Sequence, residues 1–210
     1  MFKKDVKYFI ANWGIKLIQL LDQVRDCRLC EKALPLGPRP VVQASADSKL
    51  LIIGQAPGSK VHQSGIPWDD PSGDRLREWL RLDKETFYDA NKIAIMPMGF
   101  CYPGKGQSGD NPPRPECAPT WHERLLNEMP SIQLTLLIGQ YAQRYYLKQL
   151  EALADYKTLT ERVKNADKAP THLLPLPHPS PRNQIWLKKN PWFEAETLPL
   201  LRKRLTMIDL

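Results

Sequence analysis

Leu50-Leu-Ile-Ile-Gly-Gln-Ala-Pro-Gly58 is the stretch that predicts the architecture, because four aliphatic residues run directly into a Gly-x-x-Pro-Gly turn. Such a run is typical of a strand buried on both faces, as in a parallel sheet. The turn then follows the carboxyl end of the strand, where open α/β sheets place their ligand crevices. We expect Gly54 and Gly58 to supply unusual backbone freedom and Pro57 to fix one dihedral angle. On these residues alone, an ordinary turn is the simpler interpretation.

Three further apolar runs indicate strands at residues 92–96, 133–139 and 172–176. The prolines of the last run indicate an edge or a strand end. Helical patterns alternate with these runs, which favours right-handed βαβ units. The sequence therefore predicts an α/β fold with three layers, in which helices cover both faces of a mainly parallel four-stranded sheet.

The helices are expected at residues 4–22, 74–82, 120–129, 141–153 and 192–205. Ser72 is the expected N-cap of the second, and Thr120 with Glu123 fits a capping box at the start of the third. Two stretches rich in glycine and proline, 59–73 and 97–119, are expected to be long loops, which are usually functional or mobile.

Composition narrows the class of protein. The 210 residues fit one domain, with an amino-terminal helix within residues 1–25. No apolar run approaches the ~18 residues of a membrane helix, and the charged amino terminus is unlike a secretory signal. We therefore expect a cytoplasmic monomer with no membrane association. The net charge of +7 and pI near 9.2 favour a polyanionic partner, although many basic proteins have none.

Four cysteines occur as two pairs. Two residues separate Cys27 from Cys30, and fifteen separate Cys101 from Cys117. Segment 27–117 thus holds four thiols, which could bind zinc or a [4Fe–4S] cluster, and the spacing alone does not choose between these. The role of either would be structural, because protein ligands fill all four positions. Four free thiols are the alternative.

Three motifs together resemble the uracil-DNA glycosylase superfamily. Gly54-Gln-Ala-Pro-Gly58 is similar to the Gly-Glu-Ala-Pro-Gly motif of the iron–sulfur (family 4) branch. Gly65-Ile-Pro-Trp-Asp-Asp-Pro-Ser-Gly73 resembles the Gly-x-Pro-Phe segment that stacks on the flipped base. His178-Pro-Ser-Pro-Arg-Asn183 resembles the second motif of single-strand-selective monofunctional enzymes. The cysteine spacing matches family 4 as well, so the resemblance, which covers about residues 27–190, implies a [4Fe–4S] cluster rather than zinc.

The resemblance implies a base excision repair enzyme that hydrolyses the N-glycosidic bond of a flipped uracil or other deaminated or damaged base. His178 would donate a hydrogen bond to the base oxygen, and Trp68 would stack on the base. The residues expected to contact the base are Gly54, Gln55, Ala56, Pro57, Gly58 and Trp68.

The activating carboxylate departs from the family pattern. Gln55 stands where family 4 has Glu, and a glutamine side chain cannot accept a proton. Asp70, and after it Asp69, is the expected replacement, because family 5 uses an Asp in a similar Asp-x-Ser-Gly segment. Both could instead be solvated loop carboxylates. Pro97 replaces the base-reading Asn, so strict uracil specificity does not follow.

Ser180, Arg182 and Asn183 are the expected contacts to DNA, either single-stranded or duplex with a flipped base. Scattered basic residues more commonly form a solvated face. Two rival functions follow: a non-catalytic iron–sulfur protein that binds single-stranded or damaged DNA, and a zinc protein of unrelated function.

Overall fold

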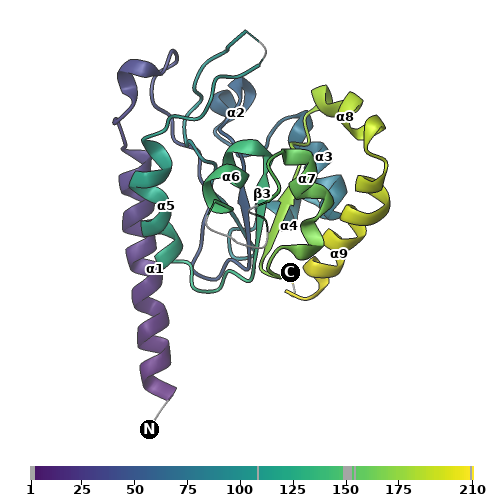
Figure 1. Ribbon diagram of the computed structural model, residues 1–210. Helices are drawn as coiled ribbons and strands as arrows, with labels where there is room; N and C mark the ends of the chain where they lie inside the picture. Colours follow the sequence, from purple (N-terminus) through teal and green to yellow (C-terminus); the bar gives the residue numbers. More distant parts are fainter. Residues whose placement is uncertain (1–2, 108, 149–152, 154, 209) are drawn as a thin grey trace.

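The computed structural model describes residues 3–107, 109–148, 153, 155–208 and 210, with the backbone alone for residues 3–13. Its central sheet has the strand order β2-β1-β3-β4, and every pairing is parallel (Figure 1). The strands are β1 (Leu50–Ile53), β2 (Ile93–Ile95), β3 (Leu134–Ile138) and β4 (Leu173–Leu176). The predicted α/β class and all four predicted strands are confirmed, including the edge position of β4.

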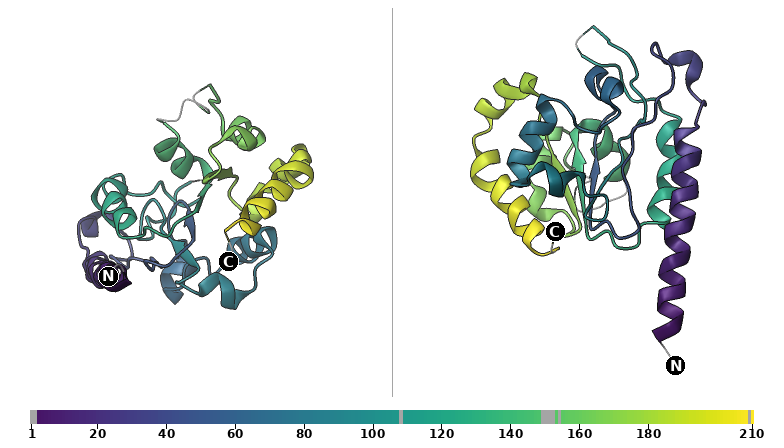
Figure 2. Two further views of the ribbon diagram at one scale, coloured as in Figure 1. Left: turned by 90° about the horizontal axis from the view of Figure 1, so that it is seen from below. Right: turned by 180° about the vertical axis from the view of Figure 1, so that it is seen from behind.

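Helices cover both faces of the sheet (Figures 1 and 2). One face carries α1 (Lys3–Arg25), α5 (Cys117–Asn127) and α6 (Gly139–Tyr146), and α1 lies beside α5. The other carries α3 (Pro71–Leu80), α4 (Lys84–Tyr88), α7 (Leu159–Lys164) and α9 (Leu198–Thr206), together with a π-helical turn at Phe193–Thr197. Shorter helices are α2 (Ser59–Ser64), α8 (Gln184–Lys189) and the 3₁₀ turns Glu31–Ala33, Ala166–Lys168 and Pro181–Asn183. The three predicted layers are present.

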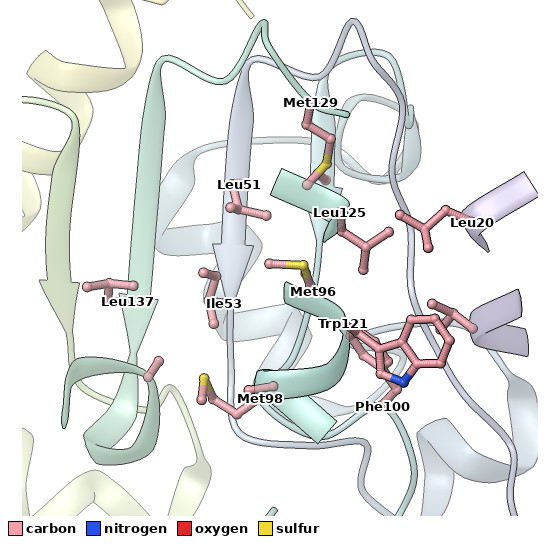
Figure 3. Close-up of a cluster of buried hydrophobic side chains, with 14 of the residues drawn as sticks. Leu20, Leu51, Ile53, Met96, Met98, Phe100, Trp121, Leu125, Met129 and Leu137 are labelled. Carbon is pink, nitrogen blue, oxygen red and sulfur yellow. The ribbon is translucent and has the colours of Figure 1, made fainter. Parts of the chain in front are cut away.

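Alternate residues of each strand face opposite layers, as the two-residue period of a strand requires. Leu51, Ile53 and Leu137 belong to the buried cluster between the sheet and the layer of α1, α5 and α6 (Figure 3), whereas Leu50 and Ile52 belong to the buried cluster on the side of α3 and α9. The side chains of β1 are fully buried on both faces. This explains the uninterrupted aliphatic run with which the sequence marks this strand.

Two predicted helix starts are wrong. Helix α3 begins at Pro71, and its N-cap is Asp70, whose Oδ1 accepts the Gly73 N–H at 2.8 Å. Proline is suited to the first helical position, so the cap lies two residues before the predicted Ser72. Helix α5 begins at Cys117 rather than at Thr120, whose hydroxyl instead donates to the Glu116 carbonyl at 2.8 Å.

The remaining differences concern lengths and the short helices α4, α7 and α8, which the sequence analysis did not predict. Residues 59–73, predicted as a loop, contain α2 and the start of α3. The predicted helix 141–153 is α6, which ends at Tyr146, and part of its expected range lies outside the described residues. Within the described part of the chain, no helix is both long and apolar enough to span a membrane.

Arg204 fixes the carboxyl-terminal helix to the segment before β4. Its buried guanidinium donates to the backbone carbonyls of Ala166, Ala169, Pro170 and Leu173. Since β4 carries the loop that holds His178, this contact also supports the pocket described below.

We expect Arg204→Met to lower the free energy of unfolding by about 3 kcal/mol, because buried carbonyls lose a charged donor. Urea unfolding measures this loss. Lys203→Met, an exposed change on the same turn, is the matched control. Equal midpoints for the two variants would contradict the assignment.

Candidate active site

A pocket of about 610 Å³ lies at the carboxyl edge of the sheet. It is formed by the turn after β1, the loops after β2 and β3, and the turn after β4. The expected residues that line it are Gly54, Gln55, Ala56, Pro57, Gly58, Trp68, Asp70, His178, Ser180, Arg182 and Asn183. Asp69 is exposed and is not among the lining residues. The structure therefore brings together residues from all three motifs.

The glycines of the first motif act by leaving space, which corrects the expected role in backbone freedom. Neither Gly54 nor Gly58 has a positive φ, and Gly58 is extended at φ −79° and ψ 176°. A Cβ at Gly54 would lie 2.9 Å from Cζ2 of Trp68. Glycine at position 54 thus lets the indole ring lie against the backbone after β1.

Trp68 is held in an unusual backbone conformation, with a φ of 57°. This left-handed region is uncommon for a bulky residue. A Cβ at Gly73 would lie 1.7 Å from the Trp68 carbonyl oxygen, so only glycine at position 73 allows this approach. The indole faces the His178 ring, with centroids 5.5 Å apart. The 65–73 segment therefore places an aromatic face beside the histidine.

His178 is a neutral hydrogen-bond donor at neutral pH. The Ser180 N–H donates to Nδ1 at 3.2 Å, so the ring proton of the neutral form is on Nε2. Burial lowers the pKa of His178 to about 4, although nearby Asp70 acts in the opposite direction. The ring is still partly open to the pocket. The Nε2–H group is thus its available donor.

The two carboxylate oxygens of Asp70 lie in different surroundings. Its Oδ1 caps α3, whereas its Oδ2 lies 3.9 Å from the position that a Cβ at Gly58 would take. The cap fixes the carboxylate, and the second oxygen is left facing the turn after β1. Of the two aspartates proposed from sequence, Asp70 is the one that lines the pocket.

The turn after β4 is braced by its own polar groups. The Asn183 side-chain amide donates to the His178 carbonyl at 2.7 Å, and the Ser180 hydroxyl accepts the Arg182 N–H at 3.2 Å. Arg75 donates to the Ser180 carbonyl at 3.1 Å. The Arg182 side chain is exposed at the pocket. Ser180 and Asn183 thus stabilise the turn, whereas the exposed Arg182 side chain reaches towards Gly109 at the rim of the pocket.

Asp110 also lines the pocket, and sequence reasoning missed it. The loop after β2 folds back on itself, with an antiparallel bridge between Lys105 and Asp110 and a bond from the Asn111 N–H to the Gly104 carbonyl. We call the described residues 104–107 and 109–111 the hairpin. Its glycines are a turn signal in the sequence, but nothing local indicates that the hairpin reaches the turn after β1.

Gln55 connects the hairpin to the first motif. Its side-chain amide donates to the Asn111 carbonyl at 3.1 Å. A glutamate at this position has no N–H group for that bond at neutral pH. The departure from the family pattern therefore has a structural consequence of its own.

The four cysteines line one small cavity of about 20 Å³, together with Phe100 and Trp121. The Phe100 N–H donates to the Cys117 sulfur at 3.3 Å. Burial raises the pKa of Cys101 to about 11 and that of Cys117 to about 12. A thiolate there needs a compensating positive charge, which an iron–sulfur core or a zinc ion would supply. The donor types and their grouping fit such a group.

A single metal ion requires its ligand side chains to lie close enough together to contact one point. Among the described residues, no three or more His, Cys, Asp or Glu side chains are arranged to hold one metal ion. A cluster of several atoms accepts thiolates that are further apart.

Comparison with protein-family models gives one match over most of the chain. Residues 41–202 match the model described as the uracil DNA glycosylase superfamily. The matched range contains all three motifs and the hairpin.

We expect Gln55→Glu to loosen the hairpin, because a carboxylate oxygen would face the Asn111 carbonyl oxygen in place of a donor. Hydrogen exchange at the Asn111 and Gly106 amides should accelerate about tenfold, as expected for the loss of one hydrogen bond. Gln133→Glu, an exposed change at the amino end of β3, is the control. Unchanged exchange in Gln55→Glu would contradict the role of this amide.

NMR can measure the protonation state of His178. The Nε2–H tautomer should persist from pH 8 to about pH 5, and protonation should be centred near a pKa of about 4. The pKa of His178 in the folded protein is below the ordinary ~6.5. The neutral ring therefore makes its full contribution to the free energy of unfolding above pH ~6.5, and this contribution is lost as the pH falls towards 4. A nitrogen titration centred near 6.5 would contradict this assignment.

Proposed function

Because the chain belongs to the uracil-DNA glycosylase superfamily, whose members typically act on DNA as glycosylases, we propose that it removes a flipped uracil or other deaminated or damaged base. The product would be an abasic site for base excision repair. One observation carries this proposal: a neutral histidine donor, an aspartate and a tryptophan face one pocket at the carboxyl edge of the sheet.

On the base side, the chemistry requires a donor. When the N-glycosidic bond breaks, negative charge develops on the departing base, and a positioned hydrogen bond lowers the barrier. His178 supplies its Nε2–H for this role. Because its pKa of about 4 keeps the ring neutral, it donates a hydrogen bond without transferring a proton.

On the sugar side, the chemistry requires negative charge and a positioned water. Positive, oxocarbenium-like character develops on the sugar as the bond breaks. The Oδ2 of Asp70, which takes no part in the cap of α3, is suited to stabilise this charge and to orient water. Gln55 has an amide in place of a carboxylate, and this amide is engaged with Asn111.

Base selection is expected to be broader than in a strict uracil enzyme. The Trp68 indole gives a wide stacking surface, and the backbone of Gln55 and Ala56 can meet a base edge. Pro97 lines the pocket where the related enzymes have an amide side chain. We therefore include hypoxanthine with uracil as candidate substrates.

DNA would approach over the turn after β4. Arg182 is exposed there, and Lys188 and Lys189 lie in the last turn of α8. These charges suit phosphates beside a flipped nucleotide. The net charge of +7 adds attraction over longer distances.

The second candidate function is a non-catalytic DNA-binding relative. Gln55 favours it, because the carboxylate of the first motif is replaced by an amide that holds the hairpin. This protein would bind single-stranded or damaged DNA without forming an abasic site.

An excision assay distinguishes the two functions. Enzyme in excess is incubated with oligonucleotides that carry uracil or hypoxanthine, each single-stranded and in duplex. We expect alkali-sensitive cleavage at one of these bases. Retained binding with no abasic product on any substrate would favour the non-catalytic function.

Two variants then test the roles of the side chains. His178→Ala should reduce single-turnover excision by about 10²–10³-fold through loss of the donor. Asp70→Asn should reduce it by about 10²-fold, and because Asn is also a good N-cap, α3 should keep its stability. Full activity in either variant would remove that residue from the mechanism.

We also propose that Cys27, Cys30, Cys101 and Cys117 bind a structural [4Fe–4S] cluster, as in the iron–sulfur branch. Their common cavity and the Phe100 N–H directed at Cys117 support this. The cluster would tie the segment after α1 to the loop that carries the hairpin.

Protein purified without oxygen should contain about four iron and four sulfide per chain and absorb in the visible range. Cys117→Ser should lower the iron content. Stoichiometric zinc with no iron would support the zinc alternative instead.

A further inference from the structure

Asp110 and Asp70 approach one position from two separate segments. Oδ2 of Asp110 lies 3.5 Å from the place that a Cβ at Gly58 would take, and Oδ2 of Asp70 lies 3.9 Å from the same place. One aspartate comes from the hairpin and the other from the start of α3. Both line the pocket that also holds His178 and Trp68.

Gly58 keeps the space between these carboxylates open. Its extended backbone is one that alanine also adopts. Glycine is therefore not needed here for conformation. A methyl group at this position would instead lie against both carboxylate oxygens, in a space suited to a water molecule.

The two carboxylates differ in their contacts. Asp70 uses Oδ1 to cap α3. Among the described residues, no hydrogen-bond donor contacts the Asp110 carboxylate. Burial raises the pKa of Asp110, and nearby Asp70 raises it further, whereas Arg182 and Lys105 act against this. A carboxylate with a raised pKa is a better proton acceptor near neutral pH.

We propose that Asp110 is a second catalytic carboxylate, which together with Asp70 holds the attacking water in front of Gly58 and accepts its proton. This inference rests on the proposed glycosylase function. Asp70 orients the water and stabilises the charge on the sugar, while Asp110 is the base.

The step balances as follows. The water oxygen forms a bond to C1′ of the sugar, the C1′–N bond breaks, and its electron pair goes to the base, which the His178 donor stabilises. One water proton goes to the Asp110 carboxylate and then to the departing base. The products are the free base and an abasic sugar with a hydroxyl group at C1′, and Asp110 is ionised again.

Gln55 is a positioning residue in this scheme. Its amide holds the Asn111 carbonyl, one residue beyond Asp110. Replacement of the family glutamate by Gln55 thus removes one carboxylate from the first motif and fixes another at the pocket.

The test is single-turnover excision from pH 4 to pH 9 with wild-type protein, Asp110→Asn, Asp110→Glu and Gly58→Ala. Asp47→Asn is the matched control, because it removes an exposed carboxylate just before the amino end of β1. DNA affinity and thermal midpoint are measured for each variant.

We expect Asp110→Asn to lose about 10²-fold or more in rate, with its thermal midpoint and DNA affinity retained. The wild-type rate should rise with pH through an acid limb above the ~3.9 of an ordinary aspartate. That limb should move or disappear in Asp110→Asn. Among the described residues, the charged or titratable groups that interact with Asp110 are Asp70, Arg182, Lys105 and Tyr102, so the Asp70→Asn profile is recorded too. Asp110→Glu should recover part of the rate, and Gly58→Ala should be slow but folded.

Excision by Asp110→Asn within about threefold of wild type, with the same acid limb, would overturn the role of Asp110 while the glycosylase function stands. Wild-type protein that binds DNA but excises no base would overturn the glycosylase function, and this inference with it.

Discussion

Burial of the central strands on both faces is the constraint on which the rest of this structure depends. A strand such as β1, with every side chain fully buried, cannot carry catalytic polar groups without a large desolvation cost. Chemistry is therefore confined to the loops that leave the carboxyl edge of the sheet. In parallel strands these loops all leave the same edge, which is why motifs more than one hundred residues apart line one pocket.

The loops are fixed by contacts with one another. Gly54 accommodates the Trp68 indole, Gly73 accommodates the Trp68 carbonyl, and the Gln55 amide holds the hairpin at Asn111. These contacts depend on close approach and on hydrogen bonds to backbone. They let a partly open pocket keep a defined geometry, which supports the preorganisation that electrostatic catalysis requires.

Local sequence patterns predict the strands and several turns of this molecule. The features that they do not predict depend on contacts between residues far apart in the sequence. Each strand was visible as an apolar run, and the turn around His178 was visible from its prolines, because these signals lie within a few neighbouring residues. The position of Asp110 depends on its pairing with Lys105 within the hairpin. It also depends on the hydrogen bond between Gln55 and Asn111, which are 56 residues apart. The cap of α3 was misplaced because Ser72 and Asp70 are both good caps, and Pro71 decided between them.

The loop between β2 and α5 begins and ends at the cysteine cavity, while its hairpin reaches the pocket. The two ends of this loop are thus fixed at the cysteine cavity, and its middle is fixed at the pocket. An insertion or deletion there would displace Asp110 or a cysteine, and a shift in one place must be matched by a shift in the other. We therefore expect evolution to accept amino-acid substitutions in this loop more readily than changes in its length.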